Sequence, residues 1–207
     1  MTEIETIDAG VQRLFRLVAD GLEHATDAFV RGDRRLAASV VAFDPEIDLL
    51  HRDVEDLAQA LLMSRETLTD TEMRFLLCVL RVAPELERSA DLVEHIALRT
   101  GALTACLPDD ARLLIANMGR YATAMWRTAG EAWIARDWLL LEELCACDDA
   151  IDDLHVLFVD RLSSLSLTTA DAIELGLVGR FFERLGDHAV NVTRRLRFLT
   201  PVLVPAV

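Results

Sequence analysis

The sequence predicts an all-α protein made of two tandem three-helix bundles that are related by internal duplication. Apolar residues recur every three to four positions over long stretches, which is the spacing of amphipathic helices. The 207 residues include nine Gly and five Pro, and β-branched runs are few, so strands are not expected. The second half of the chain repeats the pattern of the first half. We therefore expect one bundle from residues 1–104 and a second from residues 105–207.

Six helices are expected, three in each half. In chain order they cover residues 4–31, 34–65, 71–100, 110–135, 138–163 and 170–199. Gly32 and Asp33 separate the first helix from the second as a stop signal followed by an N-cap, and residues 136–137 take the same place in the second half. Pro45 and Pro84 lie inside expected helices, and we expect each proline to kink its helix.

Aligning the chain with itself supports the duplication. When residues 18–57 are shifted by 104 positions, 11 of 40 residues are identical without a gap. A shift of 96 superimposes Glu87 and Asp91 on Glu183 and Asp187. The difference between the two shifts corresponds to a shorter connection between the second and third helices of the second half.

Composition excludes several classes of protein. The formal net charge of −14 argues against a nucleic-acid ligand, since nucleic-acid binders carry a basic surface, and favours cations or basic protein surfaces as partners. No apolar run is long enough for membrane insertion as a helix, and the acidic residues 1–5 do not resemble a signal peptide. Four cysteines are expected to be core thiols in a reducing cytoplasm: Cys78, Cys106, Cys145 and Cys147.

Four pairs of acidic residues stand four positions apart, one pair on the second and one on the third helix of each half. The pairs are Asp44 and Asp48, Glu87 and Asp91, Asp148 and Asp152, and Glu183 and Asp187. Residues i and i+4 lie on the same helical face. Reflecting the second helix onto the third about turns near residues 68 and 167 brings the two pairs of each half to one level. Each half is therefore expected to hold a cluster of four carboxylates.

Four carboxylates this close raise each other's pKa unless a counter-charge neutralises them. Their oxygen atoms suit hard cations such as Mg²⁺, Ca²⁺, Mn²⁺ or iron ions, and Zn²⁺ is a further candidate. Two alternatives remain open on spacing alone. Arg88 and Arg184 could form an ion-pair network with the acids, or the acids could form a solvated face without a ligand.

Four polar residues near the acid pairs are weaker candidate ligands. His51 and His155 occupy equivalent positions, each three residues after an aspartate. His95 follows Asp91 by four residues, and the second half has Asn191 at the equivalent position. The alternative for each histidine is a polar residue that lines a groove. His188 follows Asp187 directly and is expected to point away from the acid face.

These residues carry a resemblance to a known family. Glu183-Arg-Leu-Gly-Asp-His188 with Asn191, and Asp148-Asp-Ala-Ile-Asp152, resemble the signature acidic motifs of PhoU proteins, most closely those of actinobacteria. The family pattern is an acidic residue, three intervening residues and Asp, twice in each three-helix bundle. This chain is similar to it in number, spacing and order. In the first half, Ser89 and Ala90 stand where the family usually has an apolar residue and Gly.

The resemblance implies a function as well as a fold. It implies metal ions or metal clusters at the acid motifs, a cytoplasmic location and a homodimer. It also implies negative regulation of phosphate-starvation signalling, through contact with the ATPase of the phosphate ABC transporter and with a phosphate-sensing histidine kinase.

A non-enzymatic, metal-binding regulator is the leading hypothesis, because no Ser-His-Asp set, phosphate-binding loop or CxxC zinc knuckle can be assembled. The alternative is a ferritin-like or di-iron carboxylate oxidase, or a metal-storage protein. That class places Glu-x-x-His pairs in a single four-helix bundle. Asp48 with His51, and Asp152 with His155, come close to this pattern but lie in separate halves. A third hypothesis is a structural helical adaptor.

Overall fold

The computed structural model describes residues 2–64, 68–137 and 139–199, and these contain eight α-helices, one 3-10 helix and no strand. The first half contains α1 (Glu3–Arg31), α2 (Arg34–Val41), α3 (Asp44–Met63), α4 (Asp70–Leu98) and α5 (Ala102–Ala105). The second half contains α6 (Asp109–Ala135), α7 (Leu141–Ser163), α8 (Thr169–Arg195) and the 3-10 helix η1 (Leu196–Leu199). The all-α prediction is confirmed.

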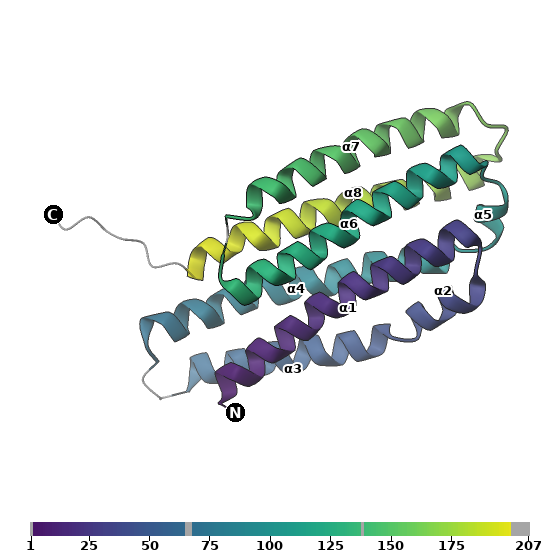
Figure 1. Cartoon of the computed structure of the whole chain (residues 1–207). Helices are drawn as coiled ribbons and strands as arrows, with labels where there is room; N and C mark the ends of the chain where they lie inside the picture. The colour runs from purple at the N-terminus through teal and green to yellow at the C-terminus, as the bar shows by residue number, and fades with distance from the viewer. Residues whose placement is uncertain (1, 65–67, 138, 200–207) are drawn as a thin grey trace.

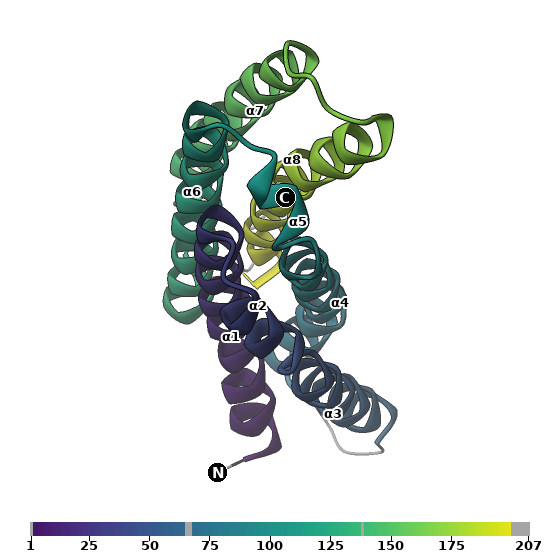
Figure 2. The ribbon, with the colours of Figure 1, turned by 90° about the vertical axis from the view of Figure 1, so that its right-hand side faces the viewer.

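The long helices form two three-helix bundles, α1 with α3 and α4, and α6 with α7 and α8 (Figure 1). The bundles lie side by side, with α1 against α6 and α4 against α8. Viewed from the end, α3 and α7 lie on opposite sides of the molecule, and the other four long helices lie between them (Figure 2). Among the described residues we find no helix with the length and apolar character needed to cross a membrane.

The expected second helix, over residues 34–65, is in fact two helices. Helix α2 ends at Val41 and α3 begins at Asp44, so Pro45 lies in the first turn of α3. Proline has no backbone N–H to donate, and this is harmless in a first turn, where the N–H groups have no intrahelical acceptor. The prediction of one helix kinked at Pro45 is therefore wrong. Pro84 behaves differently, since α4 runs through it without a break.

Two further expectations need correction. The short helix α5 was not predicted, and α7 begins at Leu141, later than the expected start at residue 138, which lies outside the described residues. The prediction of four core thiols holds for Cys78, which is buried, and in part for Cys145 and Cys147, which are half-buried and pack against the core, but it is wrong for Cys106. Cys106 is exposed at the end of α5, and Cys145 and Cys147 are partly exposed on α7, because α7 packs on the rest of the protein through one side alone.

Side chains at the C-terminal end of α6 connect the second half of the protein to the first. Among the described residues other than glycine, Arg136 alone has a left-handed backbone conformation, with φ at 55°. Its Nη2 donates to Asp8 Oδ1 at 2.7 Å, and Trp133 Nε1 donates to the same oxygen at 2.7 Å. The Arg136 guanidinium also stacks over the rings of Phe75 and Trp133. These contacts with α1 and α4 compensate for the cost of the unfavourable backbone conformation.

The contact between α1 and α6 has approximate two-fold symmetry. By the 104-residue shift, Phe15 is equivalent to Gly119, and Thr26 is equivalent to Gly130. Thr26 packs on Gly119, and Phe15 packs on Gly130. The two contacts occupy positions that a two-fold axis would exchange, but the first half contributes both larger side chains and the second half contributes both glycines. The two glycines allow the backbones of α1 and α6 to come close.

Residues near the pseudo-two-fold axis contact their own equivalents. Glu23 and Arg127 are related by the same shift, and Arg127 Nη2 lies 2.5 Å from Glu23 Oε2. Beside them, the fully buried indole of Trp126 donates from Nε1 to the Leu185 carbonyl at 3.1 Å. Buried apolar residues of both halves form one continuous core. The two bundles are therefore joined through their interiors.

Gly119→Ala should destabilise the protein, although alanine favours a helix interior over glycine by ~1 kcal/mol. An added Cβ would lie 2.3 Å from Thr26 Cγ2 and 2.8 Å from Thr26 Cβ, and rotation of the Thr26 side chain cannot relieve the second clash. We expect the free energy of unfolding in urea to fall by ~1–3 kcal/mol. Gly176→Ala on α8 is the control, because nothing lies within 4 Å of its added Cβ, and it should stabilise by ~0.4–1 kcal/mol. If both substitutions changed the free energy of unfolding equally, the close contact of α1 and α6 at Gly119 would be contradicted.

Candidate functional site

In the first half, the hairpin of α3 and α4 brings the two predicted acid pairs together. Burial is the main cause that raises the pKa of Asp44 to about 6. The negative charges of Glu94, Asp48, Asp91 and Glu87 raise the same pKa further. The pKa of Glu87 is also raised, first by burial and then by Asp91. The four predicted acids thus lie within electrostatic range of one another.

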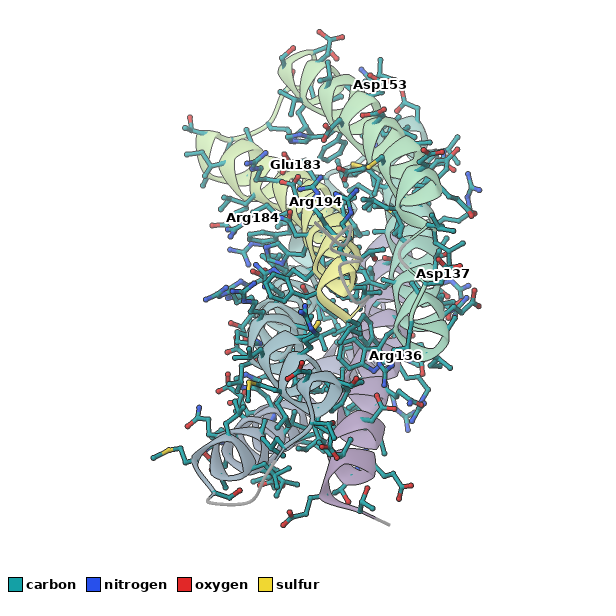
Figure 3. The ribbon with its side chains drawn as sticks, turned by 90° about the vertical axis from the view of Figure 1, so that its left-hand side faces the viewer. Arg136, Asp137, Asp153, Glu183, Arg184 and Arg194 are labelled. Atoms are coloured by element: carbon teal, nitrogen blue, oxygen red, sulfur yellow. The ribbon has the colours of Figure 1, made fainter. Side chains whose placement is uncertain are left out.

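In the second half, α7 and α8 form the equivalent cluster. Burial raises the pKa of Asp148 to about 6, and the largest contribution from a neighbouring charge is that of Asp187, followed by Asp152. Burial also raises the pKa of Glu183, although the positive charge of Arg180 lowers it in part. Figure 3 shows Glu183 on α8, at the level where α7 passes alongside. The reflection of one helix onto the other about the turn therefore predicted both clusters correctly.

The second cluster contains two buried carboxylate oxygens without a hydrogen-bond partner, Asp148 Oδ1 and Glu183 Oε2. Asp148 reaches this position because Gly186 has no side chain, since a Cβ there would lie 2.4 Å from Asp148 Oδ1. The first half has Ala90 at the equivalent position. Leaving a charged oxygen buried and unpaired is costly, and a cation would supply the missing interaction.

The carboxylates of each cluster lie near one another, but their oxygen atoms do not converge on a single point. Over the described residues, no three His, Cys, Asp or Glu side chains form a group that could hold a metal ion as they stand. The donor set nevertheless fits a hard cation, because it consists of carboxylate oxygens and includes two that are buried and unpaired. Binding of an ion would require the side chains to rotate toward it.

Arginines neutralise the clusters in part. Arg180 pairs with Glu183 one turn away on α8, and takes the place that we expected for Arg184. Arg88 lies 3.5 Å from Glu85 instead of pairing with Glu87. Among the described residues, the pair of Arg180 with Glu183 is the one ion pair that involves any of the eight clustered acids. The second cluster therefore carries one counter-charge from the protein.

The two equivalent histidines lie beside their clusters. The charge of His51 lowers the pKa of Glu87, and the buried His51 Nε2 has no hydrogen bond, at 3.6 Å from Glu55 Oε2. Burial, and then the charge of Arg180, lowers the pKa of His155, which favours a neutral imidazole. A neutral imidazole has an unprotonated nitrogen that can donate its lone pair to a metal ion.

The other two weaker candidates make their contacts elsewhere. The ring of His95 packs against Phe181 of α8, with centroids 5.5 Å apart. Asn191 Oδ1 accepts a hydrogen bond from Arg194 Nη1 at 3.1 Å. Among the contacts of the described residues, neither side chain bonds to the acid pairs.

His188 takes part in a polar network between the two halves. As expected, it points away from the acid face. Its Nδ1 lies 2.9 Å from Ser89 Oγ, and Ser89 Oγ donates to the Glu85 carbonyl at 2.6 Å. The Ser89 hydroxyl therefore accepts from His188, which carries its proton on Nδ1. Glu85 Oε1 accepts from Arg195 Nη2 at 2.8 Å. The spacing of His188 indicated its direction, but no local pattern identifies Glu85 and Ser89 as its partners.

Comparison with known proteins places this geometry in one family. The PhoU domain matches the chain twice, over residues 11–100 and 115–196. The phosphate-specific transport system accessory protein PhoU homolog 1 of Mycobacterium tuberculosis is 31% identical over 195 residues, which cover 91% of this chain and 87% of that protein. PhoU homolog 2 of the same organism is 29% identical over 188 residues, with coverages of 88% and 87%.

Solved structures share the fold. The crystal structure of PhoU from Pseudomonas aeruginosa matches with a TM-score of 0.86 at 20% identity, over 95% of this chain and 96% of that chain. The phosphate transport system regulatory protein PhoU from Streptococcus pneumoniae matches with a TM-score of 0.81 at 19% identity, over 95% and 94% of the two chains. The arrangement of two bundles side by side is therefore common to these proteins.

In the presence of a chelator, Asp44 and Asp148 should make the protein less stable as pH rises from about 4 to 7, against the opposite contribution of His155 and His188, whose pKa is lowered by burial. The folded-state pKa of Asp44 and of Asp148 is about 6, above the ordinary value of 3.8. The folded state therefore holds these protons more tightly, and this advantage disappears as pH rises through 6. Asp44→Asn together with Asp148→Asn should reduce the loss by ~1 kcal/mol, after allowance for solvent screening of partly exposed groups.

Thermal unfolding at pH 5 and pH 7.5 measures this effect. Asp53→Asn together with Asp153→Asn removes one exposed carboxylate each from α3 and α7 and controls for the change in net charge. A double variant that keeps the pH dependence of the unchanged protein would show that crowding of these two carboxylates does not limit stability.

Proposed function

Because the chain belongs to the PhoU family, we propose that it is an accessory protein of phosphate transport that represses phosphate-starvation signalling. The observation that carries this proposal is the double match to the PhoU domain, in which both halves keep their two acid pairs. The mycobacterial relatives are named as accessory proteins of a phosphate-specific transport system. The chain matches them over most of their length, so an equivalent role is supported for the whole protein.

We propose that the protein acts in the cytoplasm by binding partners and without catalytic turnover. The partners would be the ATPase of the phosphate ABC transporter and a phosphate-sensing histidine kinase. A net charge of −14 suits the basic surface of such a partner, because opposite charges accelerate encounter and orient the two proteins. The protein would work as a homodimer.

Metal ions would bind at the two acid clusters. Asp44, Asp48, Glu87 and Asp91 would hold ions in the first half. In the second half the ligands would be Asp148, Asp152, Glu183 and Asp187, with His51 and His155 beside the two sets. Mg, Mn, Fe, Zn and Ca are the candidate metals. A bound ion supplies positive charge, which would offset the burial and the repulsion that together raise the pKa of four of these carboxylates, Asp44, Glu87, Asp148 and Glu183.

The di-iron oxidase alternative loses support from the helix arrangement. A di-iron centre needs its carboxylate and histidine ligands to converge from neighbouring helices of one bundle. Here one Asp-x-x-His pair, Asp48 with His51, lies on α3, and the other, Asp152 with His155, lies on α7. These two helices lie on opposite sides of the molecule (Figure 2). The two pairs therefore cannot share one centre.

Deletion of the gene should leave phosphate-starvation genes switched on in phosphate-rich medium, because a repressor has been removed. Transcript levels of those genes measure the effect. The unchanged gene should restore repression, and a copy in which all four acid pairs are replaced by alanine should not. Normal repression in the deletion strain would count against the regulatory role. Full repression by the copy that lacks the four acid pairs would count against a role of the acid clusters in regulation.

The second cluster should bind metal more tightly than the first. Gly186 lets Asp148 approach α8, whereas the first half has Ala90 at the equivalent position. Glu183→Ala with Asp187→Ala should therefore remove more metal from the purified protein than Glu87→Ala with Asp91→Ala. Elemental analysis measures the metal content. A chelator should also lower the melting temperature of the unchanged protein more than that of the Glu183 and Asp187 double variant. Equal losses from the two double variants would contradict this ranking.

A further inference from the structure

A cavity of about 210 Å³ lies in the first half, between α1, α2, α3 and α4. This is roughly seven times the ~30 Å³ that one water molecule occupies in the liquid. Helix α2 packs against α1 and α4 (Figure 2), and Val40 of α2 forms part of the cavity lining. Most of the cavity wall is apolar, and the apolar residues that form it are Leu17, Val18, Val40, Phe43, Ile47, Ala90 and Val93.

Three carboxylates also line the cavity, Asp20, Asp44 and Glu94, and no Lys or Arg is found among its described lining residues. Asp44 and Glu94 are half-buried, whereas Asp20 is exposed near the opening. The negative charge of Glu94 raises the pKa of Asp44, which places these two carboxylates close together. The cavity therefore combines an apolar wall with negative charge on one side.

Comparison with the second half shows how the cavity arises. Gly21 is equivalent to Met125 by the 104-residue shift, and the Met125 side chain is 1% exposed. The first half thus lacks a large buried side chain that the second half has at the same point of the fold. Above Gly21 the nearest atom to an added Cβ is Val93 Cγ1, at 3.3 Å. A larger side chain at position 21 would have to extend past Val93 into the cavity that both residues line.

The charge of the cavity is also particular to the first half. Glu94 is equivalent to Val190 by the 96-residue shift, and Val190 is 5% exposed. The same position of the fold therefore accepts a buried apolar side chain, and packing does not require a carboxylate there. Glu94 therefore places a second carboxylate beside Asp44 at a position where the fold itself does not need one.

The helix break before Pro45 opens the same region. The second half has Asp149 at the equivalent position, and α7 continues through it without interruption. In the first half the chain leaves α2 and re-enters helix at α3, which places Phe43 at the cavity with 55% of its surface exposed. Three differences between the halves, at positions 21, 45 and 94, therefore converge on one cavity.

We propose that this cavity binds a small organic cation, with its ammonium group at Asp44 and Glu94 and its apolar body against the wall. A metal ion is a poorer occupant, because hard cations require oxygen ligands or bound water around them and the wall offers mostly carbon. A neutral apolar molecule would leave the two carboxylates without a counter-charge. Small-molecule sites combine apolar walls with few, well-placed polar groups in this way. This inference goes beyond the proposed function. Asp44 is also one of the proposed metal ligands, so an organic cation and a metal ion would compete for it, and binding is therefore tested with metal removed.

The test uses the purified full-length protein and two probes of similar size, hexylammonium chloride and the neutral 1-hexanol. Binding is measured by isothermal titration calorimetry at constant ionic strength and in the presence of a chelator. Hexylammonium should bind saturably and more tightly than 1-hexanol by about tenfold, as expected for a hydrogen bond to a charged group. Equal binding of the two probes would reduce the site to an apolar cavity and overturn the proposal, as would the absence of saturable binding.

Two variants locate the site. Gly21→Met places in the cavity the side chain that the second half carries at that point, and it should abolish binding of both probes. Glu94→Gln keeps the shape of the side chain and removes its charge, so it should weaken hexylammonium about tenfold and leave 1-hexanol unchanged. Asp153→Asn, exposed on α7, is the control for net charge and should bind as the unchanged protein does.

The Glu94→Gln comparison stands on its own if Gly21→Met does not fold, which circular dichroism and thermal unfolding establish. Unchanged hexylammonium affinity in Glu94→Gln would overturn the proposal. Equal weakening in Glu94→Gln and Asp153→Asn would also overturn it, because net charge would then account for the binding.

Discussion

The crowding of carboxylates on two helical hairpins is the constraint on which the rest of the structure depends. Burial and neighbouring negative charges raise the pKa of Asp44 and Asp148 to about 6, so each cluster opposes the packing that creates it. The hairpins form because apolar contacts beside the acids favour the same arrangement. Ile47 and Ile151 lie one turn away from these aspartates and are buried. A cation at either cluster would act in the same direction as this apolar contact.

The same helices that carry the acids also join the two halves. On one face, α4 and α8 present acids to the outer helices α3 and α7. On another face they pack against each other, with His188, Ser89 and Glu85 in a buried polar network. A change of charge at one cluster therefore acts on a helix that is also part of the contact between the halves. An ion bound at either cluster, as proposed, would therefore act on a helix that both bundles share.

Duplication has produced two acid-bearing hairpins whose surroundings differ. Gly186 lets a carboxylate approach α8 closely in the second half, where Asp148 Oδ1 is buried without a partner. The first half has Ala90 at that point, and beside it a cavity that depends on Gly21. The helices have the same order and packing in both halves. The chemistry of each site is therefore set by a few side chains, and the shared fold does not dictate it.

The sequence by itself determined the helical class, the duplication and the two carboxylate clusters. Apolar periodicity, a constant shift and four-residue spacing are local properties, and reflection of one helix onto the next about their turn was enough to bring the acids together. Tertiary structure alone decided the remaining contacts. No local pattern pairs Ser89 with His188, because their helices are separated by half the chain. None shows that Gly21 leaves a cavity or that Pro45 starts a helix instead of bending one, because these outcomes depend on what the neighbouring helices place against them.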